Sequence, residues 1–396
     1  MRIRSGKEFT LESFAEGIEY AHARNKKVYV TINGFPFSSQ LKLLKKHIEA
    51  MAELKPDAFI VATPGVLNLA KQVAPDMAMH LSTQANIMNV LDAQVYYDMG
   101  ATRIITAREI SLKDLIAIKS EIPKLEIEAF VHGSMCFAFS GRCLISAVQS
   151  GRVPNRGSCA NDCRFPYTLY AENEETGTLF KLEEEPDVGT YIMNAKDLNL
   201  ASHIKEIADS GVVDSIKIEG RTKSPYYAAI TARTYAKALS DYSRGEQYPE
   251  FYQKELATTQ NRGFTDAYLV HRPFERNDTQ NHDASMFMGT HQVTALVNEA
   301  GTHFLCRFTT RPKDKLEIVA PLDAKIQIVD NEIGTIARQN DGYVIIFKKI
   351  VDDNGKEFDA IHSGNTTPIR LPANLPPFTF FRVAVAPDEV GEAIKT

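Results

Sequence analysis

The sequence lacks the features of membrane, secreted and repetitive proteins. No apolar run approaches the roughly 20 residues that a membrane-spanning helix needs. The first eight residues contain no hydrophobic stretch of the kind found in a secretory signal. Internal repeats and low-complexity tracts are also absent. These absences favour an ordinary folded protein, and we expect it to be cytoplasmic.

The chain also has no excess of positive charge and few cysteines. Its formal net charge is −5, so the chain as a whole is not a basic nucleic-acid binder, and any RNA contact must use a local patch. It has five cysteines, and an odd number in a long chain argues against a framework of disulfides. Four of the five nevertheless lie within 28 residues, from Cys136 to Cys163. This clustering is the main anomaly in the sequence.

Alternating hydrophobic patterns predict an α/β fold in the first part of the chain. Seven predicted strands alternate with helices, which implies a mainly parallel sheet. The strands are expected at residues 27–33, 57–61, 78–83, 102–106, 124–131, 189–193 and 214–219. This number fits a TIM-like (β/α) barrel that lacks at least one strand, and an open, doubly wound sheet is the alternative.

The pattern changes at two places and so predicts the domain organisation. Residues 1–244 form the barrel-like domain, with an insert at 132–188 that holds the cysteines and an acidic stretch. Residues 245–283 are polar and predict a linker with a short helix. Residues 284–396 contain short strand-like runs separated by Gly, Asp and Asn, which predict a small all-β barrel domain.

Polar residues follow most of the predicted strands. In a (β/α) barrel these strand ends carry the catalytic groups. Lys217, Glu219 and Arg221 alternate along one strand, and burying three charges on one face is costly unless a ligand or a partner pairs with them. The alternative for any single residue is that strand ends meet solvent and are polar anyway. The candidates are His132, Glu109, Lys217 and Glu219 for catalysis and Gln84, Arg108, Lys196 and Arg221 for substrate binding.

The cysteine segment predicts a metal centre. Cys136, Cys143, Cys159 and Cys163 have the spacing C-x6-C-x15-C-x3-C on glycine-punctuated loops. Structural zinc prefers pairs separated by two to four residues, and only the last two cysteines fit. A [4Fe–4S] cluster is held by four cysteines and tolerates irregular spacing, so we predict this cofactor. Zinc, a redox disulfide or catalytic thiol, and chance clustering remain alternatives.

The same segment is locally basic. Between Cys136 and Tyr167 four arginines stand against one acid, a local net charge of +3. Arginine suits phosphate and carboxylate recognition, and the interleaved aromatic residues can stack on bases. We therefore predict that Arg142, Arg152 and Arg156 bind RNA or an acidic ligand. Alternatively, they balance the charge of the cluster.

The run from Glu128 to Ser146 resembles the signature of the collagenase-like peptidase family, a peptidase U family. Every signature position is met over these 19 residues. Similar blocks occur at residues 81–86, 107–109, 194–198 and 217–221, so the resemblance covers nearly the whole chain.

The resemblance implies a function in tRNA modification. The branch that the chain is most similar to is implicated in prephenate-dependent 5-hydroxylation of the wobble uridine of tRNA. It carries a [4Fe–4S] cluster on four cysteines, which implies the same role for the four here. Lys217, Arg221 and Arg108 would then hold prephenate or another dicarboxylate. Relatives begin with about one more βα unit, so we expect the barrel to lack its first strand or strands.

Two other functions remain open. The family name implies protein hydrolysis, but the sequence has no His-Glu-x-x-His zinc helix and no Gly-x-Ser-x-Gly elbow. A nucleophilic thiol also needs a lone, His-paired setting, which a group of four cysteines does not provide. The last possibility is a non-catalytic RNA-binding factor with a structural metal.

Overall fold

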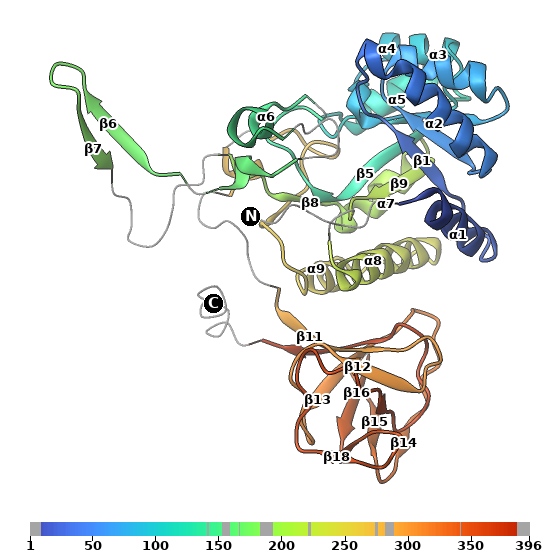
Figure 1. Ribbon diagram of the computed structural model, residues 1–396, viewed down its shortest axis with the longest axis vertical. Coiled ribbons are helices and arrows are strands. Elements are labelled where there is room, and N and C mark those ends of the chain that lie inside the picture. Colours follow the sequence, from blue (N-terminus) through green and yellow to red (C-terminus); the bar gives the residue numbers. More distant parts are fainter. Residues whose placement is uncertain are drawn as a thin grey trace. The chain divides into compact units, whose positions relative to one another are not determined.

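A computed structural model of the chain shows two compact units. One comprises Met1–Thr222 and Arg262–Phe287, and the other comprises Lys223–Asn261 and Met288–Thr396. Figure 1 traces the chain through both. The structure describes residues 9–140, 142–152, 159–165, 167–182, 193–220, 223–273, 276–281, 289–340 and 342–385.

The first unit is built on an eight-stranded sheet. Its first five strands run parallel and pair in chain order: β1 (Tyr29–Ile32), β2 (Ala58–Val61), β3 (Ala78–Leu81), β4 (Arg103–Ile105) and β5 (Glu126–Ser134). Next to β5 lie β9 (Ser215–Ile218), which is parallel to it, and β8 (Asp197–Asn199), which pairs antiparallel with its last residues. β10 (Phe264–Thr265) pairs parallel with β8.

This topology confirms the predicted α/β class with a parallel sheet. Closure into a TIM-like barrel is not confirmed, because among the described strands β1 and β10 each have only one neighbour. The order from β1 to β5 does not reverse, as it would in a doubly wound sheet. Most of the strand predicted at 189–193 lies outside the described residues, and β8 begins at Asp197.

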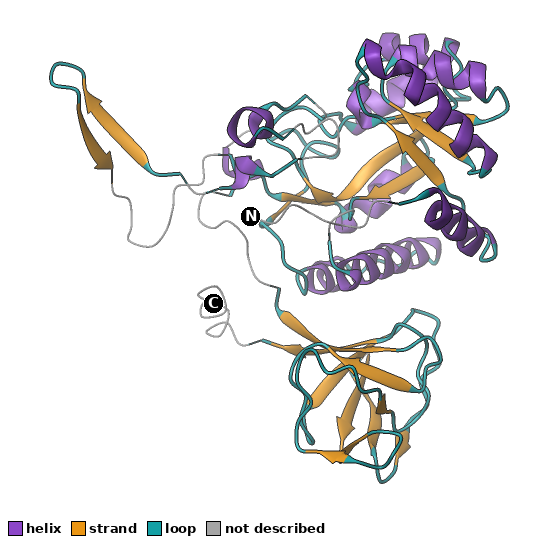
Figure 2. Ribbon diagram, viewed as in Figure 1, coloured by secondary structure: helices purple, strands orange, loops and turns teal. Residues whose placement is uncertain are grey.

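Helices pack on one face of the parallel strands, as Figure 2 shows. They are α2 (Leu41–Glu53), α3 (Pro64–Val73), α4 (Val90–Asp98) and α5 (Leu112–Glu121), and α1 (Leu11–His22) precedes β1. Along β1, Val30 and Ile32 are buried in the core formed with α2 and α3, whereas Thr31 is exposed. The strand therefore presents alternate side chains to the helices and to the opposite face of the sheet.

Side-chain caps explain where several of these helices begin. The Thr63 hydroxyl accepts a hydrogen bond from the Val66 amide, and Pro64 occupies the first turn of α3. Ser111 and Asp114 form a reciprocal capping box at the start of α5. The remaining elements of this unit are α6 (Ile145–Ser150), α7 (Ile204–Asp209), α10 (Arg276–Thr279) and the hairpin β6 (Leu169–Asn173) and β7 (Thr178–Leu182).

The second unit contains an antiparallel sheet of eight strands. They pair in the order β14 (Val329–Asp330), β15 (Gly334–Gln339), β16 (Gly342–Phe347), β13 (Lys315–Val319), β20 (Phe380–Ala384), β11 (His291–Val297), β12 (His303–Cys306) and β19 (Ile369–Arg370). Its core includes Phe304, Phe347 and Phe381, whose ring centroids lie 5.0–6.2 Å apart. This sheet fits the predicted small β domain.

The second unit also includes two helices that precede its strands. α8 (Pro225–Ser243) packs Tyr226 and Ile230 against Val319 and Phe380 of the sheet, and α9 (Pro249–Leu256) follows. The compact units therefore do not divide at residue 244. The segment 245–283, predicted as a linker, contains α9, β10 and α10. No helix in the described part of the chain is long and apolar enough to cross a bilayer.

Candidate functional site

A close approach between β5 and the end of β9 builds the candidate site. Gly133, near the end of β5, has a φ of +124°, and a Cβ there would lie 2.7 Å from the Cβ of Glu219. Only glycine adopts this conformation readily and leaves this space. Cys136 follows two residues after the end of β5, so Gly133 brings Glu219 close to the first cysteine.

Arg108, three residues after β4, joins these elements. Its guanidinium pairs with Glu219, donates to the Ser140 hydroxyl at 3.2 Å and lies 4.1 Å from the ring centroid of Phe130. Burial lowers the pKa of Arg108, but the Glu219 carboxylate and the Cys136 thiol outweigh it and raise the pKa. Arg108 therefore stays charged beside the first cysteine.

A group of hydrogen-bond acceptors lies next to Arg108. The side-chain amide of Asn86 donates to the Ser140 carbonyl at 2.9 Å, and the Ser140 amide hydrogen bonds to the Glu109 carboxylate. Burial raises the pKa of Glu109. Oε2 of Glu109, Oε1 of Gln84 and Oδ1 of Asn86 are buried, and no residue that the structure describes donates to them. This edge of the sheet therefore suits a ligand that donates hydrogen bonds.

Lys217 lies deeper on the sheet face opposite the helices. Its ammonium donates to Glu128 at 2.6 Å, and Arg103 donates to the same carboxylate at 3.1 Å. The Glu128 side chain is only 7% exposed. Lys217 therefore already has a carboxylate partner within the protein. This ion pair offsets the free-energy cost of burying the ammonium charge.

The four clustered cysteines are free thiols. Cys136 and Cys159 are exposed, and Cys143 and Cys163 are half-buried. Burial raises the pKa of Cys163, Arg164 opposes this effect, and the other three thiols raise the pKa further. The other three sulfurs thus lie within electrostatic range of Cys163.

A metal site is not preassembled in the described residues. Among them no three His, Cys, Asp or Glu side chains lie close enough to hold a metal ion. The chemistry of the donors nevertheless fits an iron–sulfur cluster, because four thiolates carry negative charge and Arg108, Arg164 and Arg262 act electrostatically on these cysteines. Ligation of a cluster by the four cysteines stays a prediction.

Comparison with known proteins identifies the family. The profile of peptidase family U32 matches residues 1–279. The chain belongs to this family. A Helicobacter pylori relative named tRNA hydroxylation protein P is 58% identical over 97% of this chain and 91% of the relative. An Escherichia coli protein of the same name is 35% identical over 81% and 76%. A Porphyromonas gingivalis protein named collagenase is 32% identical over 68% and 66%.

The structure places the other predicted site residues of this U32 protein in varied settings. His132 is buried, and its ring centroid lies 5.9 Å from that of Phe264. Arg142 is exposed, with its guanidinium 5.7 Å from the ring centroid of Phe35. Arg152 and Lys196 are half-buried, and Arg156 and Arg221 lie outside the described residues. The structure thus brings together Arg108, Glu109, Glu219 and Cys136, whereas Arg142 lies against Phe35 and Gln84 is linked to this group through its carbonyl, which accepts from Asn86 at 3.3 Å.

Sequence reasoning missed Arg262, a buried arginine of the predicted linker. The side chain pairs with Asp197 of β8, and the Arg262 amide donates to the same carboxylate at 3.2 Å. The Arg262 carbonyl accepts a hydrogen bond from the Asn281 side chain at 3.0 Å. Little in the sequence could have identified Arg262. It lies just before β10, and a strand of two residues is too short to show a hydrophobic period.

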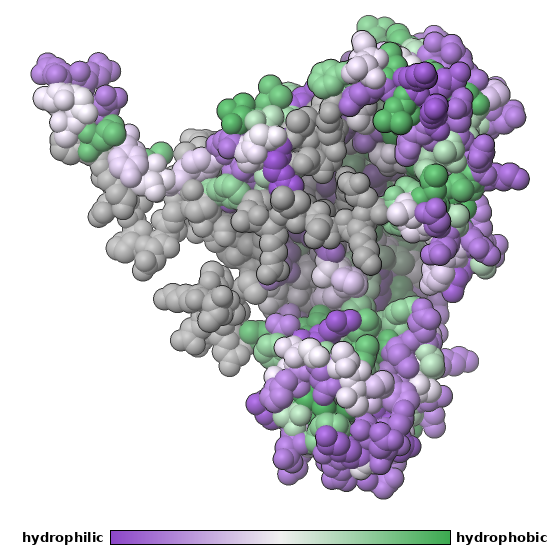
Figure 3. Space-filling model, in the orientation of Figure 1, coloured by the Kyte–Doolittle hydropathy of each residue, from purple (hydrophilic) through white to green (hydrophobic). Residues whose placement is uncertain are grey.

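Apolar side chains are exposed in and beside the cysteine loops of this U32 protein. The exposed fraction is 50% for Phe137, 56% for Phe139, 70% for Leu144 and 80% for Val148. Figure 3 shows hydrophobic surface over α6, the helix that contains Val148. Such exposure next to candidate metal ligands indicates a binding surface.

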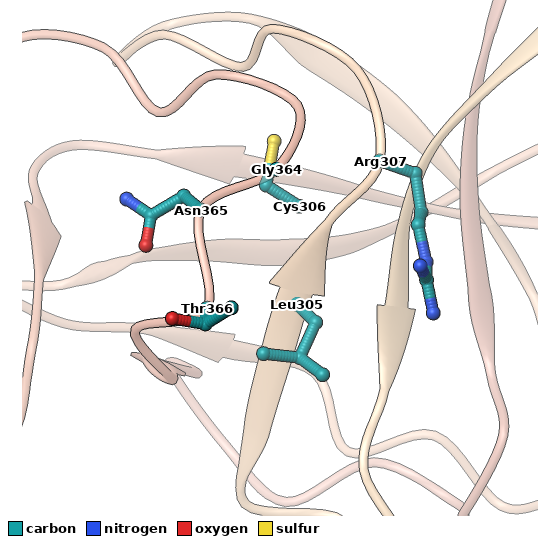
Figure 4. A pocket seen from close by; sticks show the side chains of 6 residues that line it. All are labelled: Leu305, Cys306, Arg307, Gly364, Asn365 and Thr366. Carbon is teal, nitrogen blue, oxygen red and sulfur yellow. The ribbon is translucent and has the colours of Figure 1, made fainter.

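The fifth cysteine lies in the second unit, at the end of β12. Cys306 is 4% exposed, and its thiol donates to the Phe308 carbonyl at 2.7 Å. It borders a pocket of about 270 Å³, seen in Figure 4, with Leu305, Arg307 and residues 364–366. Cys306 is therefore a buried residue of the β unit.

Proposed function

We propose that this U32 protein hydroxylates RNA and that its substrate is the wobble uridine of tRNA. The observation that carries the proposal is the position of Cys136, one of four free thiols, just after β5 and beside Arg108, Glu109 and Glu219. The names of the Helicobacter pylori and Escherichia coli relatives support RNA as the substrate. Prephenate or a similar dicarboxylate is the proposed co-substrate.

The four cysteines would hold a [4Fe–4S] cluster, which supplies electron transfer when bound. Arg108, held by Glu219 and Ser140, would orient the carboxylate of the co-substrate near Cys136. Glu109, whose pKa is raised by burial, would hold or move a proton. Gln84 and Asn86 offer acceptor oxygens to the imide N–H of a uracil base.

The surface around the cysteines supports an RNA substrate. A wobble base is unpaired in free tRNA, so it can be splayed out and stacked on aromatic side chains. Phe137 and Phe139 are exposed within the cysteine segment, whose net charge is +3 in a chain of net charge −5. This local charge suits phosphate contacts in a chain that is acidic as a whole.

Metal and nucleoside analysis of matched variants tests the proposal. We expect anaerobically purified protein to contain about four iron atoms per chain and equivalent sulfide. Cys136→Ala and Cys163→Ala are expected to lose most of the iron, whereas Cys306→Ala, in the other unit, keeps it. In cells lacking the native protein, the wild type but not Cys136→Ala restores hydroxylated uridine in tRNA, measured by mass spectrometry. Stoichiometric zinc without iron would overturn the cluster.

Protein hydrolysis is the second candidate, favoured by the relative named collagenase. The chain carries neither of the common hydrolase motifs, so we expect no cleavage of gelatin or casein above that of a variant with all four clustered cysteines replaced. Robust cleavage that depends on these cysteines would favour hydrolysis over hydroxylation.

A further inference from the structure

Arg262 is the largest side chain that the described part of the molecule buries fully, at 2% exposure. One nitrogen, Nη2, pairs with Asp197. The other two nitrogens, Nε and Nη1, are buried and have no hydrogen-bond partner among the described residues. A buried guanidinium with unfilled donors is unfavourable, so these two groups indicate an acceptor that this protein holds when it functions.

The position of Arg262 limits what this acceptor is. Asp197 pairs with Ser134 in the sheet, and Ser134 precedes Cys136 by two residues. Of the charged groups that act most strongly on Arg262, Asp197 is already bonded and Arg164 is a cation. Cys163 lies close enough to act electrostatically on Arg262, and its sulfur can accept a hydrogen bond. Together with the pairing of Asp197 and Ser134, this places the unfilled donors near the cysteine site.

We infer that Arg262 is a positioning residue of the cysteine centre, and that one of its unfilled donors, Nε–H or Nη1–H, donates to sulfur at Cys163, because the two groups point to different sides of the planar guanidinium. This inference rests on the proposed iron–sulfur function. Hydrogen bonds and a fixed positive charge at a cluster sulfur stabilise the reduced state, because reduction adds one electron and so negative charge. Arg262 thus raises the reduction potential and holds the Cys163 ligand in place.

Two substitutions separate this role from simple packing. Arg262→Lys keeps the charge but loses the planar fork that can reach Asp197 and a sulfur together. Arg262→Gln combined with Asp197→Asn removes both charges, so no buried carboxylate is left without a partner. Arg272→Gln is the matched control, because it removes one arginine charge at an exposed position of the same unit.

The measurement is a potentiometric titration with dithionite, followed by electron paramagnetic resonance, on samples of known iron and sulfide content. For the neutral pair we expect the ratio of oxidised to reduced cluster, at the wild-type midpoint, to rise about tenfold, equivalent to about 59 mV for one electron. Arg262→Lys is expected to raise the same ratio by a smaller factor. Arg272→Gln leaves it unchanged.

Four other outcomes are also decisive. Full iron and an unchanged midpoint in both Arg262 variants would show that the side chain does not contact the cluster. Loss of iron from Arg262→Lys with unchanged circular dichroism and melting temperature supports the positioning role. If the neutral pair does not fold, Arg262→Lys decides alone. Absence of iron from the wild-type protein would refute the proposed cluster itself. This outcome is distinguishable from any effect that is seen only in the variants.

Discussion

The two units each bury an arginine, and the two arginines differ in how their donors are used. Arg382 in the second unit bonds through every nitrogen: Nε to Glu317 at 2.8 Å, Nη1 to the Tyr226 hydroxyl at 3.0 Å and Nη2 to Glu255 at 2.7 Å. Arg262 in the first unit has one carboxylate partner and two unfilled nitrogens among the described residues. A saturated arginine holds a fold together, whereas an unsaturated one indicates a site.

The surroundings of Arg382 support this distinction. Glu255 on α9 also pairs with Arg233 on α8 at 3.5 Å, and Glu317 on β13 also pairs with His291 on β11 at 3.5 Å. The network therefore ties both helices to the sheet of the second unit. No thiol lies among the hydrogen-bond partners of Arg382, and these partners all belong to this unit.

The largest predicted effect is on Arg382. Arg382→Met leaves the mostly buried Glu255 without its best partner, and we expect the free energy of unfolding to fall by about 3–5 kcal/mol. Urea denaturation followed by far-ultraviolet circular dichroism measures the change. Lys348→Ala, whose pair with Asp330 joins two exposed side chains of the same unit, is the control and is expected to cost much less. Equal losses in the two variants would remove the contrast between buried and exposed pairs.

An acid titration sharpens the comparison by separating the units. Burial, followed by the charge of Arg103, lowers the pKa of His80 on β3 from 6.5 to about 4. The unfolded chain therefore binds the proton first, and up to about 3 kcal/mol of stability is lost as pH falls from about 6.5 to 4. His80→Gln flattens this slope in the first unit, measured by hydrogen exchange of its peptides. The control His47→Gln, exposed on α2, leaves the slope intact.

The smallest predicted effect concerns Glu317 in the second unit. Hydrogen bonds from His291 and Arg382 lower its pKa from 4.5 to about 2. A carboxylate with a lowered pKa stabilises the fold above its unfolded pKa, and this contribution is lost as pH falls from about 4.5 to 2. Its side chain is 45% exposed, so solvent screening keeps the effect small. Peptides of the second unit are expected to lose protection from hydrogen exchange only as pH falls from about 4.5 to 2. Glu317→Gln is expected to abolish this loss of protection. Loss beginning near pH 6 would contradict the assignment.

Local patterns were enough to predict much of the fold. Helix caps depend on adjacent residues: Thr10 caps α1, and Ser224 caps α8 with Pro225 in its first turn. Long elements with a clear period were also found where expected, because each contains several turns or alternations. By contrast, β8 and β10 have three and two residues, too few for any period. The use of residues 264–265 in the sheet was therefore not predictable from the sequence.

The candidate site was predicted in its composition but not in its pairing. The clustered cysteines, Arg108, Glu109 and Glu219 were identified because polar residues at strand ends and closely spaced thiols are local features. The bond between Lys217 and Glu128 was not predicted, because it joins residues 89 positions apart. Arg262 was missed for the same reason, since its carboxylate partner lies 65 residues away.

By itself the sequence determined the order of helices and strands, the glycine at position 133 and the presence of four thiols within one segment, because each depends on neighbouring residues. Only the tertiary structure decided which charges are already neutralised, as at Lys217 and Arg382, and which donors remain unfilled, as at Arg262. The physical reason is that burial and long-range pairing set the cost of a charge, and both arise only when distant segments meet.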